Sequence, residues 1–155
     1  METKFLFPNV FKKIGWAIFI PSLIVAILFL FYEFEWSFLD ARVFALFNDG
    51  LMQEAKSTGM IEDNLTNELI GISLLVSAVF VAFSKEKEED EFIMKIRLES
   101  LLWATWINAI FLLFSLLFIF GFSFFNAMLL NMYSLLILFI IRFNVLMIKS
   151  KNRLV

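Results

Sequence analysis

Four long apolar blocks indicate that this chain folds in a lipid bilayer. They cover approximately residues 14–32, 69–84, 101–120 and 127–148. A helix rises about 1.5 Å per residue, so about 20 apolar residues match the roughly 30 Å hydrocarbon core of a bilayer. The chain is 61% hydrophobic and 18% charged, whereas soluble domains are roughly half apolar and a quarter charged. We therefore predict an all-α membrane protein, with residues 1–155 forming a single transmembrane domain.

The distribution of Lys and Arg predicts the direction in which the four spans run. With the N-terminus inside, eleven of the 13 basic residues fall in cytoplasmic segments, and only Arg42 and Lys56 fall outside. Basic residues concentrate in the cytoplasmic loops of membrane proteins. We therefore predict a four-transmembrane-helix bundle with an N-in/C-in orientation. Its extracytoplasmic loop would cover residues 35–66, and its cytoplasmic loop residues 85–98.

The extracytoplasmic loop contains a second kind of apolar segment, WSFLDARVFALF, at residues 36–47. This segment is apolar nearly all round and too short to span a bilayer. We expect an interfacial helix here, ended by the turn residues Asn48, Asp49 and Gly50. A further short helix is expected over LMQEAKS, at residues 51–57.

The cytoplasmic loop, SKEKEEDEFIMKIRLES, has the charge pattern of a helix. Opposite charges lie four residues apart at Lys87 and Glu91, at Glu91 and Lys95, and at Lys95 and Glu99. We therefore expect the third helix to begin near Glu89 and to extend about two turns below the bilayer, as a cytoplasmic extension. This stem is either a solvated helix or a docking surface for a cytoplasmic partner.

Three charged residues near the third and fourth spans are candidate contact residues. Arg97 has apolar residues one turn away on both sides, so we expect it to reach a lipid phosphate or another helix. Arg142 lies about 9 Å of helix rise inside the end of the fourth span. It either extends to the membrane interface or pairs with Glu99 on the neighbouring third helix.

Two asparagines inside the apolar blocks are further candidate contacts. Asn108 in the third block and Asn131 in the fourth each lie on a polar face of their helix. Amide groups are costly against lipid, so both faces are expected to turn towards other helices. Hydrogen-bonded helix packing is favoured over a polar path. In the second block, Gly71, Ala78 and Ala82 predict close contact with another helix.

The absence of two residue types excludes many chemistries. The chain contains no Cys and no His, which removes thiol catalysis, disulfides, imidazole acid–base chemistry and almost every zinc or copper site. No nucleotide-binding glycine motif, HExxH or GxSxG occurs, and basic residues are too dispersed for a nucleic-acid surface. We therefore predict no enzyme activity, no catalytic, cofactor-binding or metal residues, no cofactor and no nucleic-acid partner.

Two stretches carry a resemblance to known proteins: AFSKEKEEDEFIMKIRLESLLWATWINA and LLILFIIRFNVLMIKSK. From about Asp63 to its C-terminus, the chain resembles a group of small multi-pass membrane proteins of Bacteroidota. The most specific part is SKEKEEDEFIMKIRLESLLWA. No activity is established for that group, so the resemblance implies a location in the inner (plasma) membrane and no site.

These features predict a non-enzymatic accessory or regulatory membrane subunit, or a self-associating one. Its expected partners are membrane lipids, a second copy of the chain, or a membrane or cytoplasmic protein. The alternative is an oligomeric channel or transporter subunit whose path is lined by Asn108, Asn131 and Arg142. No acidic residue lies deep in any apolar block, which disfavours a proton relay or a cation site.

Overall fold

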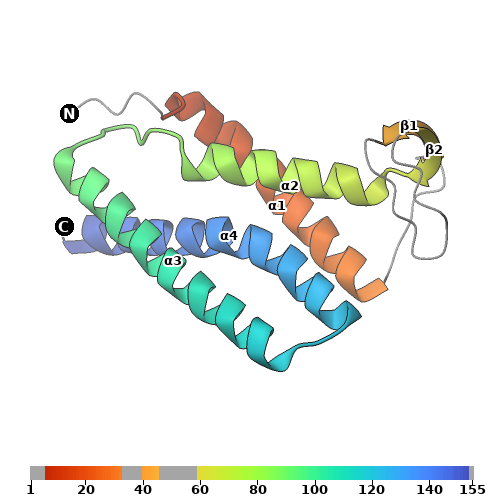
Figure 1. Cartoon of the computed structure of the whole chain (residues 1–155). Coiled ribbons are helices and arrows are strands. Elements are labelled where there is room, and N and C mark those ends of the chain that lie inside the picture. Colours follow the sequence, from red (N-terminus) through yellow and green to blue (C-terminus); the bar gives the residue numbers. More distant parts are fainter. Residues whose placement is uncertain (1–5, 33–39, 46–58, 154–155) are drawn as a thin grey trace. The chain divides into compact units, whose positions relative to one another are not determined.

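A computed structural model of the chain describes residues 6–32, 40–45 and 59–153. In this part of the chain, Figure 1 shows four helices and one pair of strands: α1 (Asn9–Tyr32), β1 (Asp40–Ala45), β2 (Gly59–Asn64), α2 (Thr66–Ala82), α3 (Glu91–Phe118) and α4 (Phe122–Arg153). The chain divides into two compact units. One contains residues 1–19 and 75–155, and the other contains residues 20–74.

Three of the four helices are long and apolar enough to cross a membrane. The qualifying stretches are Asn9–Phe29 in α1, Glu91–Phe118 in α3 and Ser123–Ser150 in α4. The fourth helix, α2, is apolar from Glu68 to Ala82 but shorter. The helices lie where the apolar blocks predict them, and their composition is that of an integral membrane protein.

The strand pair corrects one prediction. β1 pairs with β2 in antiparallel register, with Asp40 opposite Asn64 and Ala45 opposite Gly59. The interfacial helix predicted at residues 36–47 is therefore wrong over β1. A short apolar run does not distinguish a helix from a strand by periodicity, and here the backbone bonds to a partner strand that begins 14 residues after β1 ends. The other residues of that predicted helix, and the predicted helix at residues 51–57, lie outside the described residues.

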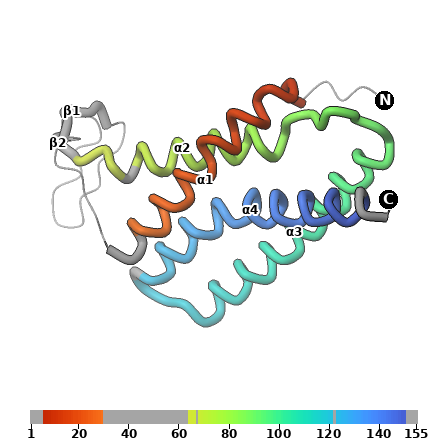
Figure 2. The backbone as a smooth tube through the Cα atoms, turned by 180° about the vertical axis from the view of Figure 1, so that it is seen from behind, coloured from red at the N-terminus to blue at the C-terminus, as the bar shows by residue number. Residues whose placement is uncertain are grey.

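Helices α3 and α4 form an antiparallel hairpin. Figure 2 shows α3 running to a tight turn and α4 returning beside it. In this turn Gly121 has a φ of 70°, a left-handed conformation that glycine adopts without the steric cost of a Cβ atom. At the other end of α3, the Asp90 side chain accepts a hydrogen bond of 2.8 Å from the Ile93 N–H. This cap starts the helix two residues after the predicted position.

Three small side chains of α3 are buried, whereas many large apolar side chains of the hairpin are exposed. Ser100, Ala104 and Ser115 of α3 are buried, and both serine hydroxyls donate to the carbonyl four residues earlier. In contrast, Trp106 is 71% exposed and Phe120 is 75% exposed. Small residues allow helices to approach closely in membranes, while large apolar side chains face lipid. The distribution is the inverse of that in a water-soluble protein.

Candidate functional site

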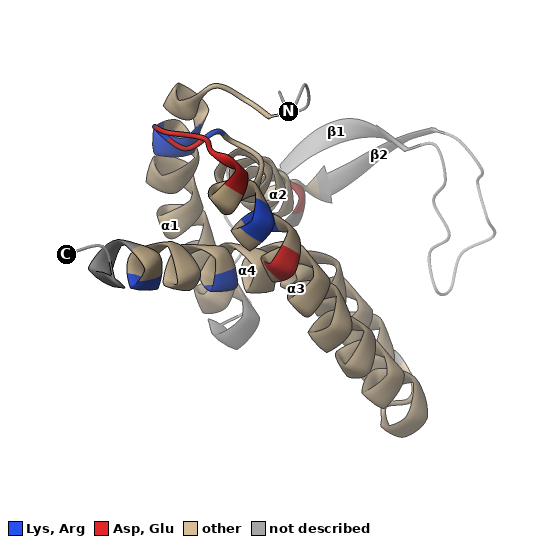
Figure 3. Ribbon diagram, turned by 90° about the vertical axis from the view of Figure 1, so that its left-hand side faces the viewer, with Lys and Arg blue, Asp and Glu red and all other residues tan. Residues whose placement is uncertain are grey.

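Charged side chains gather at one end of the α3–α4 hairpin, where α3 begins and α4 ends (Figure 3). From Ser100 to Ile141 the sequence contains no charged residue. Two further chain segments meet at this end. The Phe7 N–H donates to the Phe83 carbonyl over 2.9 Å, and the Lys85 N–H donates to the Phe7 carbonyl over 2.8 Å. These bonds fasten the segment before α1 to the segment after α2.

Three aromatic rings support this backbone contact. The ring centres of Phe7, Phe11 and Phe80 lie 5.1–5.5 Å apart, in tilted and edge-on arrangements. Such pairs contribute roughly 0.5–1.5 kcal/mol each beyond the area they bury. The start of α1 is therefore held against the end of α2 by both backbone hydrogen bonds and aromatic packing.

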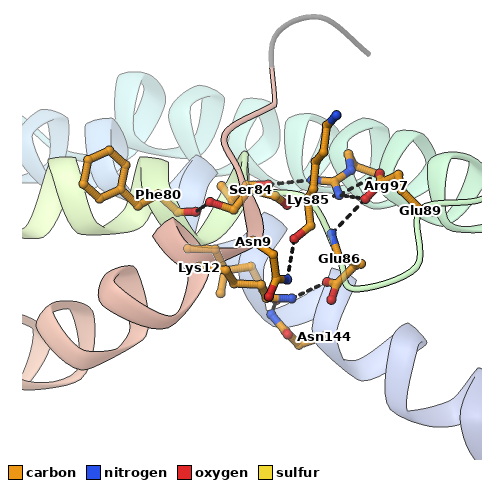
Figure 4. A network of polar contacts seen from close by, with 11 residues as sticks. Asn9, Lys12, Phe80, Ser84, Lys85, Glu86, Glu89, Arg97 and Asn144 are labelled. Carbon is orange, nitrogen blue, oxygen red and sulfur yellow. Dashed lines mark hydrogen bonds and ion pairs between the residues drawn. The ribbon is translucent and has the colours of Figure 1, made fainter. Parts of the chain in front are cut away.

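Arg97 of α3 is bound to the end of α2 (Figure 4). Its Nη1 donates to the Ala82 carbonyl over 3.0 Å, and its Nη2 donates to the Ser84 carbonyl over 3.3 Å. The last carbonyls of a helix have no partner within the helix and carry partial negative charge, so a guanidinium stabilises them. Nη2 also forms an ion pair of 3.1 Å with Glu89. Arg97 therefore turns towards protein rather than towards lipid.

A second ion pair lies beside the first. Lys12 of α1 pairs with Glu86, and both side chains are 15% exposed. The Asn9 amide donates to the Lys85 carbonyl over 2.7 Å, and the Glu86 N–H donates to the Glu89 carboxylate over 2.8 Å. We call the set of Asn9, Lys12, Glu86, Glu89 and Arg97 the polar junction.

Phe143 of α4 lies against both cations of the polar junction. The Arg97 guanidinium carbon is 4.9 Å from the centre of the Phe143 ring, and Lys12 Nζ is 5.6 Å from it. Phe143 itself is buried. A cation over an aromatic face gains roughly 0.5–2 kcal/mol, and more when water is excluded. Segments from all four helices thus contribute to one partly buried cluster.

A small pocket opens beside the polar junction. It has a volume of about 120 Å³ and is lined by Lys12, Glu86, Asn144, Met147 and Ile148. Its polar groups already have partners, since Lys12 and Glu86 are paired and the Asn144 amide donates to the Ile140 carbonyl over 2.7 Å. Drug-sized ligands occupy pockets of roughly 300–1,000 Å³. This pocket is suited to a few water molecules.

Asn108 and Asn131 are brought together inside the α3–α4 hairpin. Each side-chain amide donates to the side-chain oxygen of the other over 3.4 Å, and the Asn131 amide also reaches the Asn108 backbone carbonyl. The Ser134 hydroxyl, which the sequence did not single out, donates to the Asn108 side chain. The described polar groups of this face therefore bond to one another across the two helices.

The predicted pair of Arg142 and Glu99 is wrong. The Arg142 guanidinium lies over the ring of Trp103, 4.7 Å from its centre, and no ion pair joins it to Glu99 within the described ranges. Glu99 is exposed. Trp103 lies one turn further along α3 and offers a flat indole face, while an exposed carboxylate avoids the cost of losing its hydration.

Within the described residues, no group of three or more acidic, Cys or His side chains is placed to hold a metal ion. The ionic groups of the polar junction are bound to each other or to backbone carbonyls. Comparison with protein families, curated proteins and solved structures found no match to this chain.

Proposed function

We propose that this protein is a non-enzymatic inner-membrane subunit that presents an ordered cytoplasmic loop to another protein. It has four spans, with both termini inside. The loop runs from Lys85 to Asp90, between α2 and α3, and the polar junction holds it in place. The proposal is supported by the arrangement of the helix ends and by the way the loop is bound.

The positions of the helix ends support four crossings. The start of α1, the end of α2 and the start of α3 all meet at the polar junction, and α4 ends beside it. If α1 carries the chain across the membrane, α2 must return it before α3 begins. With 17 residues, α2 is about 25 Å long. That length is slightly short, and a bilayer adapts to such a mismatch by local thinning. The concentration of Lys and Arg at this end favours the cytoplasmic side.

Cysteine labelling will test the topology, because the chain has no native cysteine. We expect Ser123→Cys, in the exposed α3–α4 turn, to react with a membrane-impermeant maleimide on intact cells. Lys87→Cys, in the exposed loop, should react only after the membrane is permeabilised. With the N-terminus inside, failure of α2 to cross would exchange the sides of the two positions and reverse the labelling pattern. That result would contradict the four-span arrangement.

The binding of the loop is the observation that carries the proposed role. Backbone and side-chain bonds fix it at both ends, through Lys85 and Glu86 on one side and Glu89 on the other. Between and beyond these anchors, Lys87, Glu88, Asp90 and Glu91 are exposed. A surface that is ordered before binding loses less entropy when a partner docks. A loop that only solvates a helix would not require two ion pairs.

Photo-crosslinking in cells will test the association. A photoreactive amino acid at Glu88 should give one defined protein adduct, and the charge reversals Lys87→Glu and Asp90→Lys should reduce it several-fold by removing electrostatic complementarity. The matched control places the photoreactive group at Lys13, which is exposed near the same end but outside the loop. Equal adducts at both positions, or none at Glu88, would contradict a specific loop partner. An adduct of two copies of this chain would identify the partner as the protein itself.

The channel alternative gains no support from the arrangement of its expected lining. Asn108 and Asn131 bond to each other and to Ser134, and Arg142 lies over Trp103. Polar groups that satisfy each other between two packed helices stabilise the hairpin. They are not left open towards a path.

A further inference from the structure

Arg142 differs from Arg97 in what surrounds its charge. Among the described residues, the Arg142 guanidinium forms no hydrogen bond or ion pair, whereas the Arg97 guanidinium bonds through both of its Nη atoms. The Nε of each arginine is buried without a partner. Its guanidinium carbon lies 4.7 Å from the centre of the Trp103 ring. A guanidinium has five N–H donors, and leaving them unpaired near a bilayer is costly. An arginine within a membrane helix is costly, and less so near the end of the helix.

The surface around Arg142 is apolar and open. On α4 its neighbours Ile141 and Val145 are exposed, and on α3 Leu102 beside Trp103 is also exposed. Arg142 lies six residues before Ile148, about 9 Å of helix rise. Lys149 follows Arg142 by seven residues, which places it about two turns further on and only about 20° away around the helix. Helix α4 therefore carries two cations, Arg142 and Lys149, on one face, and exposed apolar side chains lie beside Arg142.

We propose that Arg142 and Trp103 bind the phosphate group of an anionic phospholipid in the cytoplasmic leaflet. The planar guanidinium forms paired hydrogen bonds with a phosphate, while the indole ring suits the boundary between headgroups and hydrocarbon. The acyl chains lie along the exposed apolar residues, and Lys149 attracts the negatively charged headgroup. The cytoplasmic assignment of the leaflet rests on the proposed topology.

The charges near the site favour an anionic ligand. α4 contains no acidic residue. On α3, Glu99 lies one turn from Trp103, and Lys95 lies one turn beyond Glu99 at the spacing of an opposite-charge pair. The net charge contributed by Arg142, Lys149, Lys95 and Glu99 is therefore positive. A phosphate would supply the missing partner for Arg142.

Native mass spectrometry of the purified, delipidated protein in detergent will test the proposal. The protein is titrated separately with phosphatidylglycerol, phosphatidylcholine and inorganic phosphate. We expect phosphatidylglycerol to be retained preferentially, and Arg142→Gln to weaken its binding by about tenfold, as expected for the loss of a charge-assisted hydrogen bond. Arg142→Lys keeps the positive charge but lacks the paired N–H donors of the guanidinium, so its affinity for phosphatidylglycerol should fall by an intermediate amount. Lys13→Gln removes one exposed charge from the same end and should bind as the unaltered protein does.

Several outcomes would overturn the proposal. Equal binding of phosphatidylglycerol by Arg142→Gln and Lys13→Gln, or equal binding of the two lipids, would show adventitious lipid only. Retention of inorganic phosphate in place of lipid would assign the site to the free anion. Loss of a dimer in Arg142→Gln, with lipid binding unchanged, would assign the guanidinium to a carboxylate of a second copy. Circular dichroism of each variant shows that it is folded. Because lipid preference in detergent does not depend on orientation, this proposal and the topology can fail separately.

Discussion

Arg97→Ala is expected to lower the free energy of unfolding by about 2–4 kcal/mol, the largest effect of a single substitution in the polar junction. The variant loses the bonds to Ala82 and Ser84, the ion pair with Glu89 and the contact with Phe143. The Arg97 and Glu89 side chains are only 13% and 16% exposed. Removing one of them therefore leaves a partly buried charge without a partner.

Thermal unfolding in detergent, followed by circular dichroism, will measure this loss. Lys95→Ala is the matched control, because it removes an exposed cation from the same helix, two residues away. We expect Lys95→Ala to change stability by less than about 0.5 kcal/mol. Arg97→Lys should fall between the two, since one ammonium group cannot reach the carbonyls and the carboxylate in the same fork geometry. Equal unfolding midpoints for Arg97→Ala and Lys95→Ala would contradict the role of Arg97.

Gly15→Leu is expected to have the second-largest effect, about 1–3 kcal/mol of destabilisation. A Cβ atom at Gly15 would lie 3.0 Å from the Phe80 Cβ and 3.0 Å from the Val81 backbone nitrogen. A backbone atom cannot move aside as the end of a flexible side chain can. Even alanine would push α1 away from α2, and leucine adds three further carbon atoms to the same place.

The same unfolding measurement applies to Gly15→Leu, with Ala17→Leu as its control. Ala17 is exposed on α1, so a larger apolar side chain there should be tolerated. Gly15→Ala should show a smaller loss than Gly15→Leu. If Gly15→Leu and Ala17→Leu have the same unfolding midpoint, the close approach of α1 and α2 at Gly15 is not needed for stability.

The sequence predicts the features of this fold that depend on nearby residues. Apolar block length places the four helices, because burial of the backbone in lipid requires helical hydrogen bonding. The structure adds the hairpin turn at Gly121, where a φ of 70° favours glycine. The β1–β2 pair is not predicted, because a short apolar run fits a helix and a strand equally well by periodicity. The pairing of β1 with β2 decides between them. Charge spacing predicts a helical stem, but it does not show that Asp90 caps it.

The polar junction is harder to predict from sequence, for a physical reason. Arg97 binds the carbonyls of Ala82 and Ser84, and backbone carbonyls leave no signal in the choice of residue. Glu89 lies eight residues from Arg97, outside the three- and four-residue spacings that identify helical pairs. The residues of the other ion pair, Lys12 and Glu86, are 74 positions apart. Nothing in the local pattern relates them.

The partner of Arg142 is not determined by its depth in the membrane alone. Counting residues along antiparallel helices places Arg142 and Glu99 at similar levels, but it does not fix the rotation of each helix. A rise of one turn, about 5.4 Å, separates Glu99 from Trp103. The structure places the guanidinium over Trp103.

The position of Phe143 in the sequence gives the polar junction an order of assembly. The ribosome makes Lys12, Glu86 and Arg97 long before it reaches Phe143, the ring that lies against both cations. Both ion pairs therefore stay more open to water until the last helix has been inserted and folds back. A chain truncated before Phe143 keeps α1, α2 and α3 but lacks the ring that lies against both cations. The polar junction is therefore complete only after α4 has been synthesised and has packed against α3.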